Sequence, residues 1–337
     1  MANSPDSRRH GVKEASLVSV VTPVFNGGEY LVECIESVIA QSYQNWEYLL
    51  VDNASTDLTP DIISRFARKD SRVKHLRFED HVGAIDNHNR AFSSIDPASE
   101  FCKIVQADDW LYPECLTKMV AAGLASETIG LVSAYFLWDT QVHLTGLPYS
   151  TVFASGREIL RQCLLGSFDV TGTPTSGLLR SRVVRSRAPF YDTALWHTDR
   201  EAAYWVLSNH DLGFVHQVLT FVRRQPGARG QFSRNANPGD PEMISLLIRY
   251  GPAVLSADEY RRVLRRYLRA YVWWHVRQLP RPSRLRQAEF FGLHRVQIAR
   301  ILDEAGEDAE VRLAMRTIEA MLLRRTRAVP EGAGLPS

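Results

Sequence analysis

Short apolar runs alternate with helix-type patterns through the first half of the chain. β-branched and aromatic residues concentrate in five runs, at 17–22, 46–51, 73–78, 101–106 and 129–137. Such runs are typical of strands buried on both faces. Between them apolar residues recur three or four positions apart, as in 31–39, which indicates amphipathic helices. The alternation predicts an α/β fold with a mostly parallel central sheet.

The second half of the chain has a less regular pattern. Strand-like runs occur at 176–180 and 212–223, and a helical pattern occupies 198–208. Residues 225–240 are rich in glycine and proline, which is typical of a lid or a disordered loop. We therefore predict four regions: a disordered arm (1–16), an α/β domain in two parts (17–137 and 138–240), a helical extension (241–327) and a loose tail (328–337).

Composition places few limits on the function. The chain has 337 residues, of which 45 % are hydrophobic and 23 % charged, as in ordinary globular proteins. The net charge of +2 gives no reason to expect nucleic-acid binding. None of the four cysteines forms a CxxC pair, so we expect buried thiols in a reducing cytoplasm. We find neither a signal peptide nor an apolar run long enough to span a bilayer.

Three polar clusters follow strand-like runs: residues 23–26, residues 52–57 and the pair Asp108-Asp109. Ligands of open α/β sheets bind beyond the carboxyl ends of the strands, so we expect these clusters to converge in space. Adjacent carboxylates repel each other unless a cation or hydrogen-bond donors offset the charge. The pair therefore fits a metal site, although a helix cap before Pro113 is the simpler alternative. Residues 52–57 likewise have an alternative explanation, because Asp, Asn and Ser are typical residues of a turn.

Taken together, three motifs resemble those of family 2 glycosyltransferases of the GT-A fold. They are Val-Val-Thr-Pro-Val-Phe-Asn (20–26), Leu-Val-Asp-Asn-Ala-Ser-Thr-Asp (50–57) and Ala-Asp-Asp-Trp-Leu-Tyr-Pro (107–113). Gly83 and the triplet Asn89-Arg90-Ala91 fit as well, and the resemblance extends from about residue 18 to 224. It implies a GT-A catalytic domain over 17–240, with a nucleotide-binding half (17–137) and an acceptor half (138–240).

The resemblance also implies a reaction. A hexosyl or related group would pass, with inversion, from a UDP- or dTDP-linked donor to an acceptor hydroxyl. The acceptor would be a glycan or a lipid-linked sugar, in the synthesis of a surface polysaccharide or another glycan. The expected cofactor is a divalent metal, Mg²⁺ or Mn²⁺, which neutralises charge on the leaving diphosphate.

Roles for single residues follow from the same resemblance. Asp52 would hydrogen-bond the base, Gly83 would let the backbone pass close to the nucleotide, and Asp108 would hold the metal and the donor. Gln106 replaces the first acid of the family's DxD motif, so Asp109 either compensates as a metal ligand or caps a helix. The other residues expected to bind the donor are Pro23, Phe25, Asn26, Asn53 and Asn89.

The general base of this family is an aspartate at the start of a helix in the second half, and Asp199 fits that place. Thr198 and Glu201 have the spacing of a capping box, so Asp199 can instead simply favour the helix dipole. His197 and Glu201 are the rival bases. Trp196 is either a sugar-stacking residue or a buried one.

An arginine-rich helical pattern occupies residues 258–278. Its apolar positions follow helical spacing, and the arginines lie on the other side. A domain helix with a solvated basic face explains this pattern. The alternative is peripheral binding to an anionic membrane at the inner face of the cell membrane.

Three other functions compete with the sugar transferase. A sugar-nucleotide nucleotidyltransferase needs a basic residue in the loop after the first strand, where the sequence has Pro-Val-Phe-Asn-Gly-Gly-Glu. A dinucleotide oxidoreductase needs a GxGxxG motif there, which is missing. A non-catalytic sugar-nucleotide-binding relative is disfavoured because Asp52, Asp108 and Asp199 are all retained.

Overall fold

The structure is a computed structural model that describes residues 16–167, 169, 172–195, 197–223, 239–278 and 288–326. Most of the expected N-terminal arm lies outside these residues, as does most of the loop predicted at 225–240. Trp196 and the predicted tail (328–337) also lie outside them.

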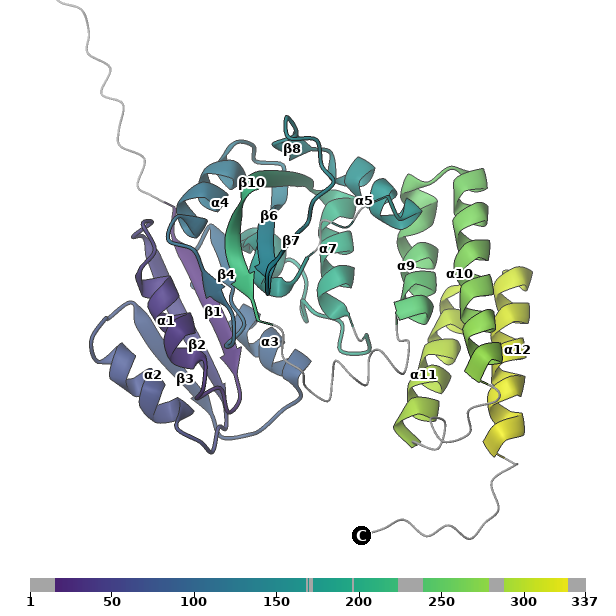
Figure 1. Cartoon of the computed structure of the whole chain (residues 1–337), viewed down its shortest axis with the longest axis horizontal. Coiled ribbons are helices and arrows are strands. Elements are labelled where there is room, and N and C mark those ends of the chain that lie inside the picture. The colour runs from purple at the N-terminus through teal and green to yellow at the C-terminus, as the bar shows by residue number, and fades with distance from the viewer. Residues whose placement is uncertain are drawn as a thin grey trace, which may run out of the picture.

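One mixed sheet forms the centre of the molecule, in the order β3-β2-β1-β4-β9-β6-β10-β5 (Figure 1). β7 pairs with β6, and β8 pairs with β10. The strands are β1 (Val18–Val24), β2 (Trp46–Asn53), β3 (Val73–Phe78), β4 (Phe101–Ile104), β5 (Trp110–Leu111), β6 (Ile129–Trp138), β7 (Gln141–His143), β8 (Phe153–Ala154), β9 (Gly177–Arg180) and β10 (Asp211–Val222).

The predicted α/β class is confirmed, but the sheet is mostly parallel only in its first part. β3, β2, β1 and β4 are mutually parallel, and β6 and β10 form another parallel pair. β9 runs antiparallel to both of its neighbours, and β5, β7 and β8 are also antiparallel. The sequence pattern predicted β9, as the run at 176–180, but it did not reveal β5, β7 and β8, because strands of two or three residues carry little periodicity.

Helices cover both faces of the sheet, each over its own apolar core. One core contains buried residues of α1, α2 and α4, and the other contains residues of α3, α5, α6 and α7. The helices are α1 (Leu31–Ile39), α2 (Thr59–Ala67), α3 (Ala84–Ser93), α4 (Cys115–Leu124), α5 (Gly156–Leu165), α6 (Ser181–Arg185) and α7 (Thr198–Asn209), with a 3-10 turn, η1 (Pro174–Ser176). All four cysteines are buried free thiols.

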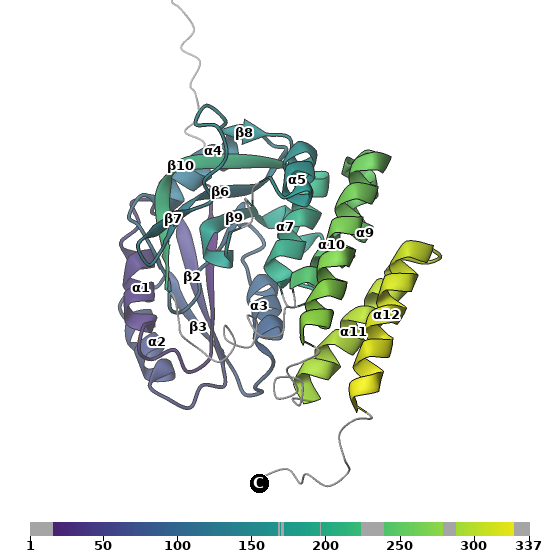
Figure 2. The same ribbon diagram turned by 45° about the vertical axis from the view of Figure 1, so that its right-hand side comes forward.

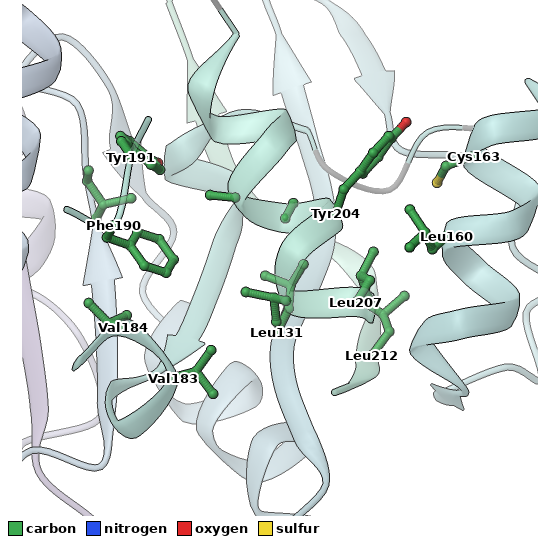
Figure 3. Packing of buried hydrophobic residues seen from close by; sticks show 14 of the residues in the cluster. Leu131, Leu160, Cys163, Val183, Val184, Phe190, Tyr191, Tyr204, Leu207 and Leu212 are labelled. Atoms are coloured by element: carbon green, nitrogen blue, oxygen red, sulfur yellow. The ribbon is translucent and has the colours of Figure 1, made fainter. Parts of the chain in front are cut away.

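The start of α7 is fixed by packing on both sides of that helix. Tyr204 and Leu207 of α7 lie near Leu160 and Cys163 of α5, with Leu131 of β6 beside them (Figure 3). Burying side chains of this size stabilises the fold by roughly 1.5–3 kcal/mol each. A helix that is packed in this way holds its first turn in one position against the sheet.

The C-terminal part is a group of four helices with a core of its own. The helices are α9 (Gly239–Val254), α10 (Ala257–Gln278), α11 (Ala288–Glu304) and α12 (Ala309–Thr326). They lie beside α5 and α7, on the side of the molecule away from α1 and α2 (Figure 2). Among the described residues, no helix is long and apolar enough to cross a membrane.

Candidate active site

The predicted polar clusters converge because the parallel strands end together. The register pairs Val24 of β1 with Asp52 of β2, and Val21 with Ile104 of β4. Beyond these ends lies a cavity of about 790 Å³. Seven of the residues predicted to form the site line it: Pro23, Phe25, Asn26, Asn53, Asp108, Asp109 and Asp199.

The loop after β1 is fastened to the loop after β2. Asn26 has a left-handed backbone (φ 50°), and its Oδ1 accepts the N–H of Thr56 (2.9 Å). The Gly27 N–H donates to Thr59 Oγ1 at 2.9 Å. A Cβ on Gly27 would lie 2.6 Å from a methyl group of Val24, so this close approach requires glycine. The rim of the cavity is therefore preformed.

Asp52, near the end of β2, is buried. The side chain is 0 % exposed and is not among the cavity-lining residues. Its Oδ1 accepts the N–H of Ser55 (2.9 Å), and its Oδ2 accepts from Arg77 Nη1 (2.9 Å). A carboxylate bonded in this way shapes the turn beneath the cavity, and the direct bond from Asp52 to the base remains a prediction.

Asn53 links the cavity wall to the segment that precedes α3. Its amide bonds both main-chain groups of Val82, with Nδ2 donating to the carbonyl (2.8 Å) and Oδ1 accepting the N–H (2.9 Å). Gly83, next in the chain, is the N-cap of α3 and does not line the cavity, whereas Ala84 does. The φ of Gly83 is −57°, which any residue can adopt, so its predicted close approach to the nucleotide remains a prediction.

Asp108 and Asp109 have different environments. Asp108 lines the cavity, and its carboxylate forms no hydrogen bond with the side chain or backbone of another described residue; burial raises its pKa. Asp109 is 3 % exposed, and its oxygens accept from Thr175 Oγ1 (2.5 Å) and from the N–H of Arg223 (2.9 Å). Burial, followed by the charge of Asp108, raises the pKa of Asp109 to about 7.

These environments assign different tasks to the two carboxylates. Magnesium sites that include a substrate phosphate commonly use only one or two protein carboxylates. Asp108 has the position and the unused oxygen atoms for such a site. Asp109 also lines the cavity, but protein donors already occupy its oxygens, and this geometry argues against the predicted metal contact. Among the described residues no group of three acidic, histidine or cysteine side chains forms a metal cage.

Gln106 stands where the family motif has its first acid. Its Nε2 lies 2.9 Å from Nε2 of His88, and both side chains line the cavity beside Asp108. The Gln106 N–H donates to Thr175 Oγ1 (3.1 Å). The same threonine bonds Asp109, so η1 is tied to the end of β4.

A buried lysine supports this junction from below. Lys103 of β4 is 0 % exposed; its Nζ donates to the carbonyls of Thr175 and Gly177, the latter at 3.0 Å. Burial lowers its pKa. Because Lys103 lies in β4 and its acceptors lie in η1 and β9, it joins the two halves of the domain beneath the cavity.

Asp199 is the second residue of α7 and lines the cavity. Burial raises its pKa, which strengthens it as a base. Thr198 and Glu201 do not form the predicted capping box. The N-cap is His197. The carboxylate of Glu201 instead forms an ion pair with Arg187 (2.8 Å) and accepts a hydrogen bond from the Tyr250 hydroxyl (2.6 Å).

The two rival bases are directed elsewhere. Glu201 is 1 % exposed, and neither Glu201 nor His197 is among the cavity-lining residues. The ring of His197 bonds Glu242 of α9. Of the three candidates, only Asp199 faces the cavity.

Asn89, predicted to contact the donor, acts on the protein instead. Its Nδ2 donates to the carbonyl of Tyr191 (2.9 Å), and its Oδ1 accepts the N–H of Tyr191 (2.8 Å). Tyr191 lines the cavity, whereas Asn89 does not. Asn89 therefore fixes a wall of the cavity from α3.

The comparisons with known proteins agree with this geometry. The model of the family described as "Glycosyl transferase family 2" matches residues 19–185. Glycosyltransferase GlyG of Streptococcus pneumoniae is 42 % identical over 227 residues, which are 64 % of this chain and 73 % of GlyG. The chain belongs to glycosyltransferase family 2. A shorter match, 34 % identical over 118 residues, is to O-antigen biosynthesis protein RfbC of Myxococcus xanthus, covering 34 % of this chain and 9 % of RfbC.

Solved structures of glycosyltransferases share the fold. The 1–349 fragment of S. aureus TarS, in complex with UDP, has a TM-score of 0.58 at 15 % identity and covers 96 % of this chain and 94 % of that chain. Mannosyltransferase PcManGT from Pyrobaculum calidifontis, in complex with GDP-Man and Mn²⁺, has a TM-score of 0.51 at 17 % identity, covering 92 % and 86 %. The predicted GT-A fold is confirmed. The protein is a glycosyltransferase, and the family match speaks against the nucleotidyltransferase and the oxidoreductase.

Several cavity residues were missed by the sequence analysis. Arg223, at the end of β10, donates from Nε to the Asp108 carbonyl (3.2 Å) and brings a cation to the cavity. Asn87 is 3 % exposed and lines the cavity, and its Oδ1 accepts no hydrogen bond from a described residue. For Arg223, the only signal in the sequence was weak, namely its position at the end of a predicted strand. Nothing distinguished Asn87 from its exposed neighbours in α3.

Proposed function

We propose that this family 2 glycosyltransferase moves a sugar, with inversion, from a nucleoside-diphosphate donor to an acceptor hydroxyl, with Asp199 as the general base. One observation carries the proposal: Asp108 and Asp199, from opposite halves of the domain, line the same cavity. The proposed catalytic domain is residues 17–240, with its nucleotide half at 17–137 and its acceptor half at 138–240. The helical region is residues 241–327.

The reaction needs a single displacement. The acceptor oxygen bonds the anomeric carbon while its proton passes to the Asp199 carboxylate. The bond from that carbon to the diphosphate oxygen breaks, and the electron pair leaves with the nucleoside diphosphate. Attack from the face opposite the leaving group inverts the configuration. The positive charge that develops on the sugar ring resembles that in glycoside hydrolysis.

The proposed donor is a UDP- or dTDP-sugar. Pro23, Phe25, Asn26 and Asn53 line the nucleotide end of the cavity, and the buried Oδ1 of Asn87 is an acceptor for a base N–H or a ribose hydroxyl. The TarS complex with UDP supports a uridine nucleotide. Because PcManGT was solved with GDP-Man, a guanosine nucleotide must be tested beside it. Melting shifts with UDP, dTDP, GDP and ADP decide between them, and equal shifts for all four would contradict the proposal.

The proposed cofactor is Mg²⁺ or Mn²⁺, held by Asp108 together with the donor diphosphate. A bound cation of this kind stabilises negative charge on the leaving diphosphate. Arg223 adds a fixed positive charge beside Asp108. Because the protein supplies few ligands to the metal, we expect the metal and the nucleotide to strengthen each other's binding. Each should bind only weakly in the absence of the other.

Replacing Asp108 tests the metal site. We expect Asp108→Asn to abolish the gain in UDP affinity that Mn²⁺ gives the wild type, because the amide carries no charge. Calorimetric titration of UDP with and without Mn²⁺ measures this coupling, and Asp86→Asn, an exposed carboxylate in the first turn of α3, is the control. An unchanged coupling in Asp108→Asn would remove Asp108 from the metal site.

Replacing Asp199 tests the base. Asp199→Asn keeps the size of the side chain, and we expect turnover to fall by roughly 10²–10⁴-fold with UDP affinity unchanged. Release of nucleoside diphosphate from a panel of sugar nucleotides measures turnover, and NMR of the product gives the anomeric configuration. Near-wild-type turnover with a lower melting temperature would mean that Asp199 only stabilises α7. A retained configuration would contradict single displacement.

We propose an acceptor of the surface-polysaccharide or glycan class, free or lipid-linked. The match to the O-antigen biosynthesis protein RfbC supports this class. Four buried free thiols suit a reducing, cytoplasmic compartment. No contact with nucleic acid enters the proposal.

A peripheral membrane contact through α10 is also proposed. Arg262, Arg266, Arg269 and Trp273 follow one another at helical spacings of four, three and four residues and are all exposed. We call them the α10 stripe. An exposed tryptophan beside arginines suits the interface of an anionic bilayer, where the ring enters the headgroup layer and the charges meet lipid phosphates.

A further inference from the structure

The segment that carries Asp199 is bound by the C-terminal helices. This segment runs from Tyr191 to Glu201, with Trp196 outside the described residues. Side chains of α9 and α11 reach it at three places, namely Asp192, His197 and Glu201. None of the described residues of α9 to α12 lines the cavity itself. The contacts with this segment therefore link these helices to cavity-lining residues such as Asp199.

The contact nearest to the proposed base is made by Glu242 of α9. This carboxylate is 2 % exposed. One of its oxygens accepts the backbone N–H of His197 (3.1 Å), and the other bonds the His197 ring. His197 is the N-cap of α7, two residues before Asp199. A single side chain thus fixes both the main chain and the ring at the residue where α7 begins.

The other two contacts flank the same stretch. Asp192 bonds Arg300 of α11 (2.5 Å) and lies 3.4 Å from Arg249 of α9. Glu201, two residues after Asp199, accepts from the Tyr250 hydroxyl of α9 (2.6 Å). The ion pairs of Asp192 are partly buried, and they resist displacement because moving one partner leaves the other charge with less compensation.

We propose that Glu242 is a positioning residue for glycosyl transfer, and that the C-terminal helices act as a support for the base. The inference rests on the proposed role of Asp199. Glu242 sets where α7 starts, and the start of α7 sets where the Asp199 carboxylate meets the acceptor hydroxyl. A displacement of about 1 Å in a reacting group can cost roughly 10²-fold in rate. Donor binding lies in the other half of the domain and does not depend on this contact.

The test compares Glu242→Gln with a matched control in the whole chain. Glutamine keeps the volume and one acceptor oxygen but loses the charge and the second acceptor. We expect kcat to fall roughly 10- to 100-fold, while UDP affinity in Mn²⁺ stays within twofold of the wild type. The control is Arg265→Gln, which removes an exposed ion pair to Glu310 within the same helices (2.9 Å) and should leave both quantities unchanged.

The double variant separates positioning from stability. If Glu242 acts through Asp199, adding Glu242→Gln to Asp199→Asn should reduce turnover no further, because the interaction that it supports is already lost. Turnover is measured well below the melting temperature of each variant. A further drop in the double variant would place the effect of Glu242 elsewhere and overturn the inference.

Failure of this inference can be told from failure of the proposed function. If Asp199→Asn retains turnover, the base assignment fails first, and the inference falls with it. If Asp199→Asn is inactive but Glu242→Gln retains kcat, only the positioning role is overturned. A joint loss of kcat and UDP affinity in Glu242→Gln, in proportion to unfolded protein, also overturns it.

Discussion

Asp108 and Asp109 are neighbours in the chain, but their carboxylates meet different surroundings. Asp108 has oxygen atoms available to a ligand, whereas Asp109 is enclosed by Thr175 and the backbone of Arg223. The energetic cost of enclosing Asp109 appears in its pKa of about 7. A carboxyl group with a raised pKa carries less negative charge beside Asp108. The repulsion between the two carboxylates is therefore reduced when no cation is bound.

The raised pKa of Asp109 predicts how stability depends on pH. Between its ordinary value of 3.8 and about 7, the folded protein keeps a proton that the unfolded chain has lost. This contribution to stability is fully present below the unfolded pKa and is lost as pH rises through the folded pKa. Asp109→Asn cannot ionise, so its stability relative to the wild type should increase from pH 4 to pH 8. Urea unfolding without metal or nucleotide measures this, and parallel curves for the two proteins would contradict it.

Part of the cavity could be predicted from the sequence. The strand-end positions of Asn26 and Asp108, together with the resemblance to family 2, placed these residues and Asp199 at one site, and all three line the cavity. The burial of Asp52 could not be predicted, because nothing local reveals that Arg77, on the neighbouring strand, binds its carboxylate. Arg223 was missed because it meets Asp108 across 115 positions of sequence.

Among the elements, loops and helices hold the cavity together by side-chain bonds to backbone groups. Asn53 holds Val82, and Asn89 holds Tyr191, in each case through both main-chain groups of the partner. An asparagine amide matches a peptide group in shape and in its donors and acceptors. It can therefore fix irregular segments that have no strand neighbour.

Asn89→Ala should destabilise the junction between α3 and the Tyr191 segment. The change leaves two main-chain groups of Tyr191 without their partners, and about 1–3 kcal/mol of unfolding free energy should be lost. Urea unfolding measures the change. Asn209→Ala, at the end of α7, removes only exposed bonds and should have little effect. Equal stability of the two variants would mean that water replaces Asn89.

Elements of the first half could be predicted because each strand and helix is long enough to show its period. The four parallel strands and the helices between them follow from that pattern. β5, β8 and η1 are too short to show a period, and β9 is inserted between β4 and β6 by long-range pairing. Their positions depend on contacts such as those of Lys103, which no local pattern encodes.

For the whole molecule, the helical region has two distinct sides. α9 and α11 reach the segment of Asp199, whereas the α10 stripe faces solvent. The arginine-rich pattern was interpreted in two ways. As the first interpretation, a domain helix, requires, α10 buries Leu264, Leu268 and Tyr271 in the helical core. Trp273 is the feature that a solvated basic face does not explain, since it is 62 % exposed.

The α10 stripe predicts binding to anionic bilayers. Each arginine near such a surface contributes about 1 kcal/mol, so replacing Arg262, Arg266 and Arg269 with glutamine should weaken binding on the order of 100-fold. Flotation with phosphatidylglycerol vesicles measures this, and phosphatidylcholine vesicles should bind little.

High salt should reduce binding, because charge attraction is screened. The matched control replaces Arg65, Arg68 and Lys69, exposed basic residues at the end of α2, with glutamine. If both triple variants lose binding equally, net charge rather than the α10 stripe is responsible, and if the wild type does not float, α10 is simply a domain helix with a solvated basic face.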